Sequence, residues 1–107
     1  MPEGPVFTRG ALRADVKAVS VALARAGVLR GDVVSLCFRN QIESVISFLA
    51  VTWLGATAAP LNASYAAAEF EYDMLNISSK FLVVPTEGHA LAEEVAAKVG
   101  VATLGEG

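Results

Sequence analysis

The sequence predicts an α/β fold in which four helices alternate with four short strands of a mostly parallel sheet. Apolar residues recur at helical spacing in four segments, and a short run of consecutive apolar residues follows each of them. Such runs are typical of parallel strands covered by helices on both faces. The alternation also implies right-handed crossovers between the strands.

The first helix is expected to follow Thr8 and to end at Gly27, because glycine just past the last apolar position is typical of a helix end. Its apolar positions, four or three residues apart, form one buried face and comprise Leu12, Val16, Val19, Leu23 and Ala26. Residues 33–38 follow as a strand that is apolar on both sides.

The longest uncharged stretch of the chain covers 25 residues, from 44 to 68. A membrane-spanning helix needs about 17 to 25 mostly apolar residues, so its length alone suits a membrane span. Gly55, Pro60 and Asn62 interrupt the helical pattern, and no basic residues flank the stretch. We therefore expect a buried helix, a sharp stop and a buried strand at 57–61.

Asn40 is placed to cap this second helix. Phe48 and Trp53 are expected to fill the core, and the helix to have a broad buried face made of Ile42, Val45, Ile46, Leu49, Trp53 and Leu54.

The second half of the chain repeats the same plan. A loop at 62–65 leads to a helix that is expected to bury Phe70, Met74 and Ile77, and a strand at 80–84 ends at Pro85. Thr86 is expected to cap the last helix, which carries Leu91, Val95 and Val99 and ends at Gly100 before a strand at 101–104. The whole is expected to be a Rossmann-like sheet in a single partial domain, 1–107, with residues 1–7 and 105–107 frayed.

Composition limits the classes of function. The net charge is -3 without a long run of either sign, so nucleic acid is not expected as a partner. The single cysteine, Cys37, excludes an internal disulfide and favours a reducing, cytoplasmic location, and the first residues lack the pattern of a secretory signal. An apolar fraction of 54% is high for a free-standing small domain, which suggests part of a larger protein.

The residues after each strand carry little chemistry. Arg39 and Asn40, Asn62 and Tyr65, Thr86 and His89, and 105–107 follow the four strands, and none of these sets forms a phosphate-binding glycine loop. The glycine pair at 105 and 107 could open a dinucleotide-binding turn, but a loop or chain end is the simpler interpretation.

Four further candidates have structural interpretations. His89 is expected to be a solvated residue at a helix start, because no spacing places a nucleophile or carboxylate beside it. Cys37 is expected to be inert in the core. Glu69, Glu71 and Asp73 are two residues apart, which does not bring side chains together on a helix. Asp32 begins a strand, whereas a phospho-receiver needs acids at the strand's end. We therefore predict no catalytic, cofactor-binding or metal-binding residue in this chain.

One ordered string of segments is more specific than any single motif: Ala-Arg-Ala-Gly-Val at 24–28, Arg-Gly-Asp-Val-Val at 30–34, Asn40, Phe-Leu-Ala-Val-Thr-Trp-Leu-Gly-Ala at 48–56 and Ala-Pro-Leu-Asn at 59–62. It resembles the amino-terminal region of the adenylate-forming (AMP-dependent synthetase/ligase) superfamily, which includes acyl-CoA synthetases, 4-coumarate-CoA ligases and luciferases. The segments at 62–65, 69–72, 79–85 and 87–89 resemble the branch of oxalate-CoA ligase and peroxisomal-type acyl-CoA synthetases.

The resemblance implies an enzyme that joins a carboxylic acid to ATP as an acyl-adenylate and then passes the acyl group to coenzyme A, with Mg²⁺. The family's phosphate loop and catalytic lysine have no counterpart here, so the chain is expected to be inactive alone. It is expected to pair with the missing remainder of the enzyme, or with itself through exposed sheet surface. A peroxisomal location is open for the parent family. Two other interpretations stay open, a stand-alone interaction module and a small α/β ligand-binding domain.

The chain departs from the family at one helix start. The family often has threonine where this chain has Ala66, three residues before Glu69. The hydroxyl of a capping box is therefore missing, unless Ser64 caps the helix instead.

Overall fold

The computed structural model describes residues 9–105, with side-chain burial from residue 13. Its elements are α1 (Arg9–Arg25), β1 (Val33–Leu36), α2 (Gln41–Trp53), β2 (Thr57–Pro60), α3 (Ala67–Asn76), β3 (Phe81–Val84), α4 (Ala90–Val99) and β4 (Ala102–Gly105). The expected alternation is confirmed. The expectation of fraying at 1–7 and 106–107 lies outside the described residues, while Gly105 pairs with Val84 in β4.

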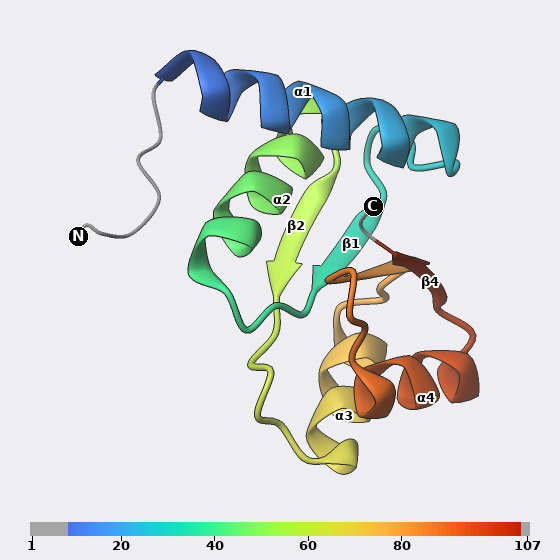
Figure 1. The fold of residues 1–107 in the computed structure, drawn as a ribbon. Coiled ribbons are helices and arrows are strands. Elements are labelled where there is room, and N and C mark those ends of the chain that lie inside the picture. Colours follow the sequence, from blue (N-terminus) through green and yellow to red (C-terminus); the bar gives the residue numbers. More distant parts are fainter. Residues whose placement is uncertain (1–8, 106–107) are drawn as a thin grey trace, which may run out of the picture.

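The four strands form one parallel sheet in the order β2-β1-β3-β4. The chain leaves the central strand β1 for β2 on one side and then crosses to β3 on the other side. Figure 1 shows α1 and α2 on one face of the sheet and α3 and α4 on the opposite face. None of the helices among the described residues is long and apolar enough to cross a membrane.

The central strands divide the core into two clusters, because successive residues of a strand point to opposite faces. From β1, Val34 and Leu36 pack under α1 and α2, while the next residue along, Cys37, packs under α3 and α4. From β3, Phe81 and Val83 join the first cluster, and Leu82 and Val84 join the second. One sheet therefore supports two separate apolar layers.

The second strand is less buried than its sequence indicates. Thr57 and Pro60, at the two ends of β2, are exposed, and the residues between them are half-buried. The prediction that this strand is buried is wrong, because β2 lies at the edge of the sheet, where one side has no neighbouring strand.

The buried face of α2 also differs from the expected one. It consists of Ile46, Ser47, Ala50 and Val51, whereas Phe48 is 40% exposed and Trp53 is 76% exposed. The expected burial of Phe48 and Trp53 is therefore wrong, as is that of Val45 and Leu49, which are 45% and 39% exposed.

The contact between α1 and α2 explains this difference. The buried Ser20 hydroxyl of α1 donates to the carbonyl of Val16 at 2.7 Å and lies 3.4 Å from the carbonyl oxygen of Ala50. Ser20 and Ala50 are small, which lets the two helices approach closely at this point. Phe48 and Trp53 lie on the outer side of α2.

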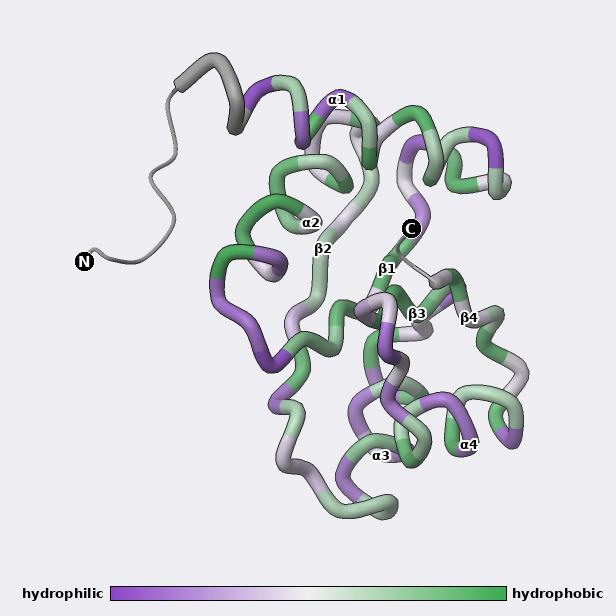
Figure 2. Tube along the Cα trace, in the orientation of Figure 1, coloured by the Kyte–Doolittle hydropathy of each residue, from purple (hydrophilic) through white to green (hydrophobic). Residues whose placement is uncertain are grey.

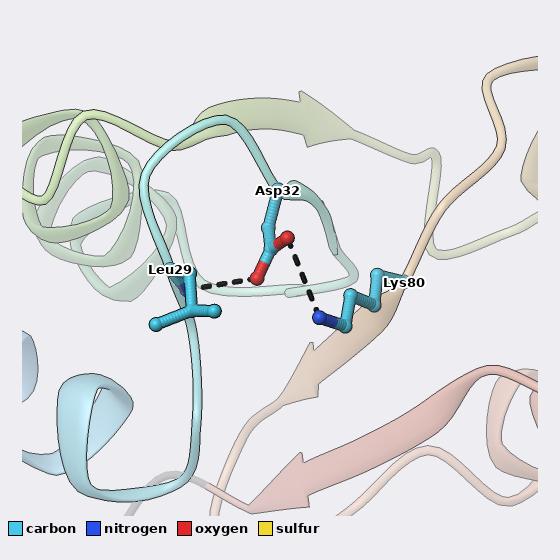
Figure 3. A network of polar contacts seen from close by, with 3 residues as sticks. All are labelled: Leu29, Asp32 and Lys80. Atoms are coloured by element: carbon cyan, nitrogen blue, oxygen red, sulfur yellow. Dashed lines mark hydrogen bonds and ion pairs between the residues drawn. The ribbon is translucent and has the colours of Figure 1, made fainter.

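At the amino ends of the strands, Asp32 connects three segments (Figure 3). Its Oδ2 accepts a hydrogen bond from the Leu29 N–H at 2.8 Å, and its Oδ1 lies 3.5 Å from Lys80 Nζ. Its backbone carbonyl accepts from the Thr57 N–H at 2.8 Å. Asp32 thus fixes the turn before β1 and holds the starts of β2 and β3 beside it.

We expect Asp32→Ala to destabilise the chain by about 1 kcal/mol, because the Leu29 N–H loses its acceptor. Asp32→Asn keeps an acceptor and removes only the ion pair with a half-exposed lysine, which is worth little; its loss should stay below about 0.5 kcal/mol. Urea unfolding of the two variants measures both values. Equal losses in the two variants would contradict the role given to the Leu29 hydrogen bond.

Candidate functional site

Parallel α/β sheets usually bind ligands at the carboxyl ends of their strands, next to the point where the strand order reverses. In this chain that point lies between β1 and β3. Three loops meet at this edge: residues 37–40 after β1, 61–66 after β2 and 85–89 after β3. They contain most of the candidate residues that the sequence singles out.

The loop after β1 serves the start of α2. Asn40 Oδ1 accepts from the N–H groups of Ile42 at 2.8 Å and Glu43 at 3.2 Å, which confirms the expected cap. Burial raises the pKa of the Cys37 thiol to about 11, and the charge of the nearby Arg39 opposes this only in part. Because the thiolate is the reactive form, Cys37 is inert at neutral pH, as expected.

The loop after β2 folds on itself. Asn62 Oδ1 accepts from the Ser64 N–H at 2.8 Å, which is an Asx turn. Ala66, and not Ser64, occupies the N-cap position of α3 and supplies no side-chain bond. Glu69 Oε1 accepts from the Ala66 N–H at 2.9 Å. Half of a capping box is therefore present, and the hydroxyl half is absent at this helix start.

The loop after β3 contradicts the expected cap at Thr86. The Gly88 N–H donates to the Pro85 carbonyl at 2.8 Å, so residues 85–88 form a turn and the helix begins three residues later than predicted. His89 is the N-cap residue of α4. Gly88 has φ +80°, and a Cβ there would lie 2.8 Å from Glu93 Oε2. Only glycine fits this turn without a shift of Glu93.

His89 is buried, with 6% of its surface exposed, so the expectation of a solvated histidine is wrong. Its Nδ1 accepts from the Ala92 N–H at 3.2 Å, and its Nε2 lies 2.8 Å from the Ala63 carbonyl oxygen. A carbonyl can only accept and an N–H can only donate, so these partners select the neutral imidazole with its proton on Nε2. His89 thereby joins the loop after β2 to the start of α4.

Aromatic contacts extend this connection. The ring of Phe70 packs edge-on against His89, with centroids 5.4 Å apart, and against Tyr65, with centroids 5.5 Å apart. The hydrogen bond from the Tyr65 hydroxyl to Asp73, together with the carboxylate's charge, raises the pKa of Tyr65. A signal for this arrangement exists in the sequence, since Gly88 precedes His89 and Glu93 follows it by four residues. That carboxylate accepts the His89 N–H at 2.8 Å.

The acidic residues of α3 do not converge. Glu69 accepts from the backbone of Ala66, Glu71 pairs with Lys98 Nζ at 2.9 Å, and Asp73 interacts with Tyr65. In the part of the chain that the structure describes, no group of three or more His, Cys, Asp or Glu side chains could hold a metal ion.

Several polar groups at this edge already have partners within the chain. At the starts of α2, α3 and α4, N–H groups are bonded to Asn40, Glu69, His89 or Glu93. A nucleotide phosphate would have to displace these bonds. These helix starts therefore do not fit a nucleotide phosphate, and they act as a structural junction.

Comparisons with known proteins agree on one family. The family described as AMP-binding enzyme matches residues 3–105. The chain is 48% identical over 85 residues to an oxalate-CoA ligase of Arabidopsis thaliana, a match that covers 79% of this chain and 16% of the relative. It is 40% identical over 95 residues to a probable CoA ligase of Humulus lupulus, covering 89% of this chain and 18% of the relative.

Solved structures share the fold. ATP-bound MatB from Rhodopseudomonas palustris gives a TM-score of 0.82 at 28% identity, over 96% of this chain and 21% of that chain. The o-succinylbenzoate CoA synthetase MenE from Bacillus subtilis gives 0.84 at 24% identity, over 95% of this chain and 26% of that one; at this identity the likeness concerns the fold alone. The chain thus spans between 16% and 26% of these proteins.

We expect His89→Ala to destabilise the chain by about 2 kcal/mol, because the Ala92 N–H and the Ala63 carbonyl both lose their partner in a buried place. His89→Asn restores a helix cap, since asparagine is a good N-cap residue, but its side chain is too short to replace both bonds. The stability of His89→Asn should therefore lie between those of His89→Ala and the parent chain. Urea unfolding measures the series. A His89→Ala variant as stable as the parent would contradict the junction role.

We expect Ala66→Thr to raise the melting temperature, because a threonine hydroxyl can accept an N–H group in the first turn of α3 and complete the capping box with Glu69. The gain should be about 1 kcal/mol. Ala66→Val has a similar shape without the hydroxyl and serves as the control in thermal melts. The same melting temperature in both variants would show that capping is not the cause.

Proposed function

The chain belongs to the family of AMP-binding enzymes, and we propose that it is the amino-terminal part of an ATP-dependent, AMP-forming acid-CoA ligase. The observation that carries this proposal is the 48% identity over 85 residues to an oxalate-CoA ligase. A ligase of this kind converts a carboxylic acid, ATP and coenzyme A into an acyl-CoA, AMP and pyrophosphate.

The complete enzyme would use ATP, Mg²⁺ and coenzyme A. The ATP-bound structure of MatB, at 28% identity, supports the first of these groups, and Mg²⁺ and coenzyme A follow from the proposed reaction. The helix starts at the carboxyl edge of this sheet do not fit a phosphate, so we propose that these groups bind to parts of the enzyme outside this chain. The contribution of this chain is a scaffold: a sheet with two apolar layers and loops that are fixed by His89 and Asp32.

The proposed acid is a short dicarboxylate of the oxalate class. Oxalate-CoA ligases from two organisms support it, the second being that of Saccharomyces cerevisiae at 36% identity over 58 residues. A 4-coumarate-CoA ligase of Arabidopsis thaliana is more distant, at 29% over 80 residues. A cytoplasmic location, expected from the single cysteine, is part of the same proposal.

A stand-alone interaction module is the second candidate. The observation in its favour is the exposure of large apolar side chains on α2, above all Trp53 at 76%. A small ligand-binding domain is not favoured, because the polar groups at the carboxyl edge already have partners.

The test begins with the transcript, in which we expect the reading frame to continue after Gly107 into a Ser/Thr/Gly-rich loop followed by Pro-Lys-Gly. The complete product should then catalyse oxalate-dependent ATP–pyrophosphate exchange, and the 107-residue chain should show none. A fatty acid and an aromatic acid serve as comparison substrates. Exchange by the 107-residue chain alone would overturn the assignment of the active site to other parts of the enzyme. Exchange with only the fatty or aromatic acid would overturn the choice of acid.

A further inference from the structure

The outer face of α2, defined here as Val45, Phe48, Leu49 and Trp53, is exposed although it is apolar. Its side chains are 45%, 40%, 39% and 76% exposed, respectively. Figure 2 shows α2 as hydrophobic over most of its length, and residues 44–68 contain no charged residue. A helix that lies on a solvated surface normally carries polar residues on its outer side, and one that is apolar all round is buried.

A pocket adjoins this face. It has a volume of about 290 Å³ and is lined by Arg13, Val16 and Lys17 of α1 and by Trp53 of α2. The ion pairs within residues 13–105 join Lys80 to Asp32 and Lys98 to Glu71, so neither Arg13 nor Lys17 has a carboxylate partner there. The surface is therefore complementary to an apolar segment that carries a negative charge beside it.

We propose that the outer face of α2 and the adjoining pocket form the seat of a later segment of the same AMP-binding enzyme, which packs an apolar surface on Phe48 and Trp53 and places a carboxylate near Arg13 and Lys17. This inference rests on the proposed function. The match that covers 79% of this chain covers only 16% of the Arabidopsis ligase, so an enzyme of that kind has ample further chain to cover the face.

A second copy of the chain is a poorer occupant. In a symmetric dimer the same patch meets itself, so Arg13 and Lys17 of one copy would approach those of the other. Like charges in a contact cost free energy, whereas a segment with a carboxylate would neutralise them.

Cysteine labelling tests the cover directly. Phe48→Cys places a thiol on the outer face of α2, and Ala97→Cys is the matched control on the exposed side of α4, beside Glu93 and Glu94. Each variant is made in the 107-residue chain and in a chimera that carries this chain in place of the matching region of the Arabidopsis oxalate-CoA ligase. Maleimide labelling is followed peptide by peptide with mass spectrometry, and the buried Cys37 reports unfolding.

We expect position 48 to react at least about tenfold more slowly in the chimera than in the chain alone, while position 97 reacts at the same rate in both. Equal rates at position 48 would overturn the proposal. So would concentration-dependent protection in the chain alone together with a dimer on size exclusion, because the occupant would then be a second copy. Labelling of Cys37 in the chimera would show that this chain does not seat on the remainder of such an enzyme. That result would also overturn the proposal.

The charges give a second, independent measurement. Arg13→Gln with Lys17→Gln should lower the melting temperature of the chimera and leave that of the chain alone nearly unchanged, because only the chimera supplies the carboxylate. Equal shifts in both would contradict the charge complementarity.

The ligase proposal is tested separately, by measuring oxalate-dependent ATP–pyrophosphate exchange in the unsubstituted chimera. Protection at position 48 without exchange would support the seat and count against the scaffold role of this chain in a ligase. Exchange without protection at position 48 would support the role of this chain in a ligase and overturn the proposed seat.

Discussion

The central strand β1 is the element on which the described fold depends. It is paired along its whole length with β2 and along most of it with β3, and its residues Val34 and Leu36 are almost completely buried. Because side chains along the strand alternate between the two faces, Val34 and Leu36 pack in one helical layer, and Cys37, directly after the strand, packs in the other. A parallel strand in this position is covered on both sides, which is why residues 33–38 are apolar except for Ser35, whose buried hydroxyl donates to Ser79 Oγ at 2.8 Å.

The loops at the two edges of the sheet hold neighbouring segments of the chain in place. At the amino edge, Asp32 fixes a turn and lies beside Lys80. At the carboxyl edge, His89 bonds the Ala63 carbonyl of the loop that leads away from β2. This segment has to pass from the edge strand to the far layer, and a buried neutral histidine holds it there. A residue type often associated with proton transfer serves here as a two-sided hydrogen-bonding link.

The sequence predicted the features that depend on local chemistry. Helical spacing located all four helices, and Gly27, Gly55 and Gly100, which each follow a helix, adopt positive φ of 106°, 79° and 81°. The cap at Asn40 was predicted for the same reason, because it involves only the next three residues. The family resemblance was also visible in the residues alone and is confirmed by the match over 3–105.

Features set by contacts distant in the sequence could not be predicted in this way. Thr86 is the better cap by residue type, but the turn from Pro85 to Gly88 moves the helix start to His89. Periodicity could not tell which side of α2 is buried, because large apolar residues lie both on its buried side and on its exposed side. The close contact of Ser20 with Ala50 determines which side of α2 faces α1, and Trp53 remains exposed.

The crossover from β2 to β3 has a consequence for biosynthesis. β1 obtains its second neighbour only when Phe81–Val84 has been made, and pairings between distant segments form late because the intervening loop must close first. The apolar α2 is therefore synthesised well before the sheet that supports it can be completed. During that interval the nascent chain presents the most hydrophobic of its four described helices to the surroundings, which is the situation in which chaperones act.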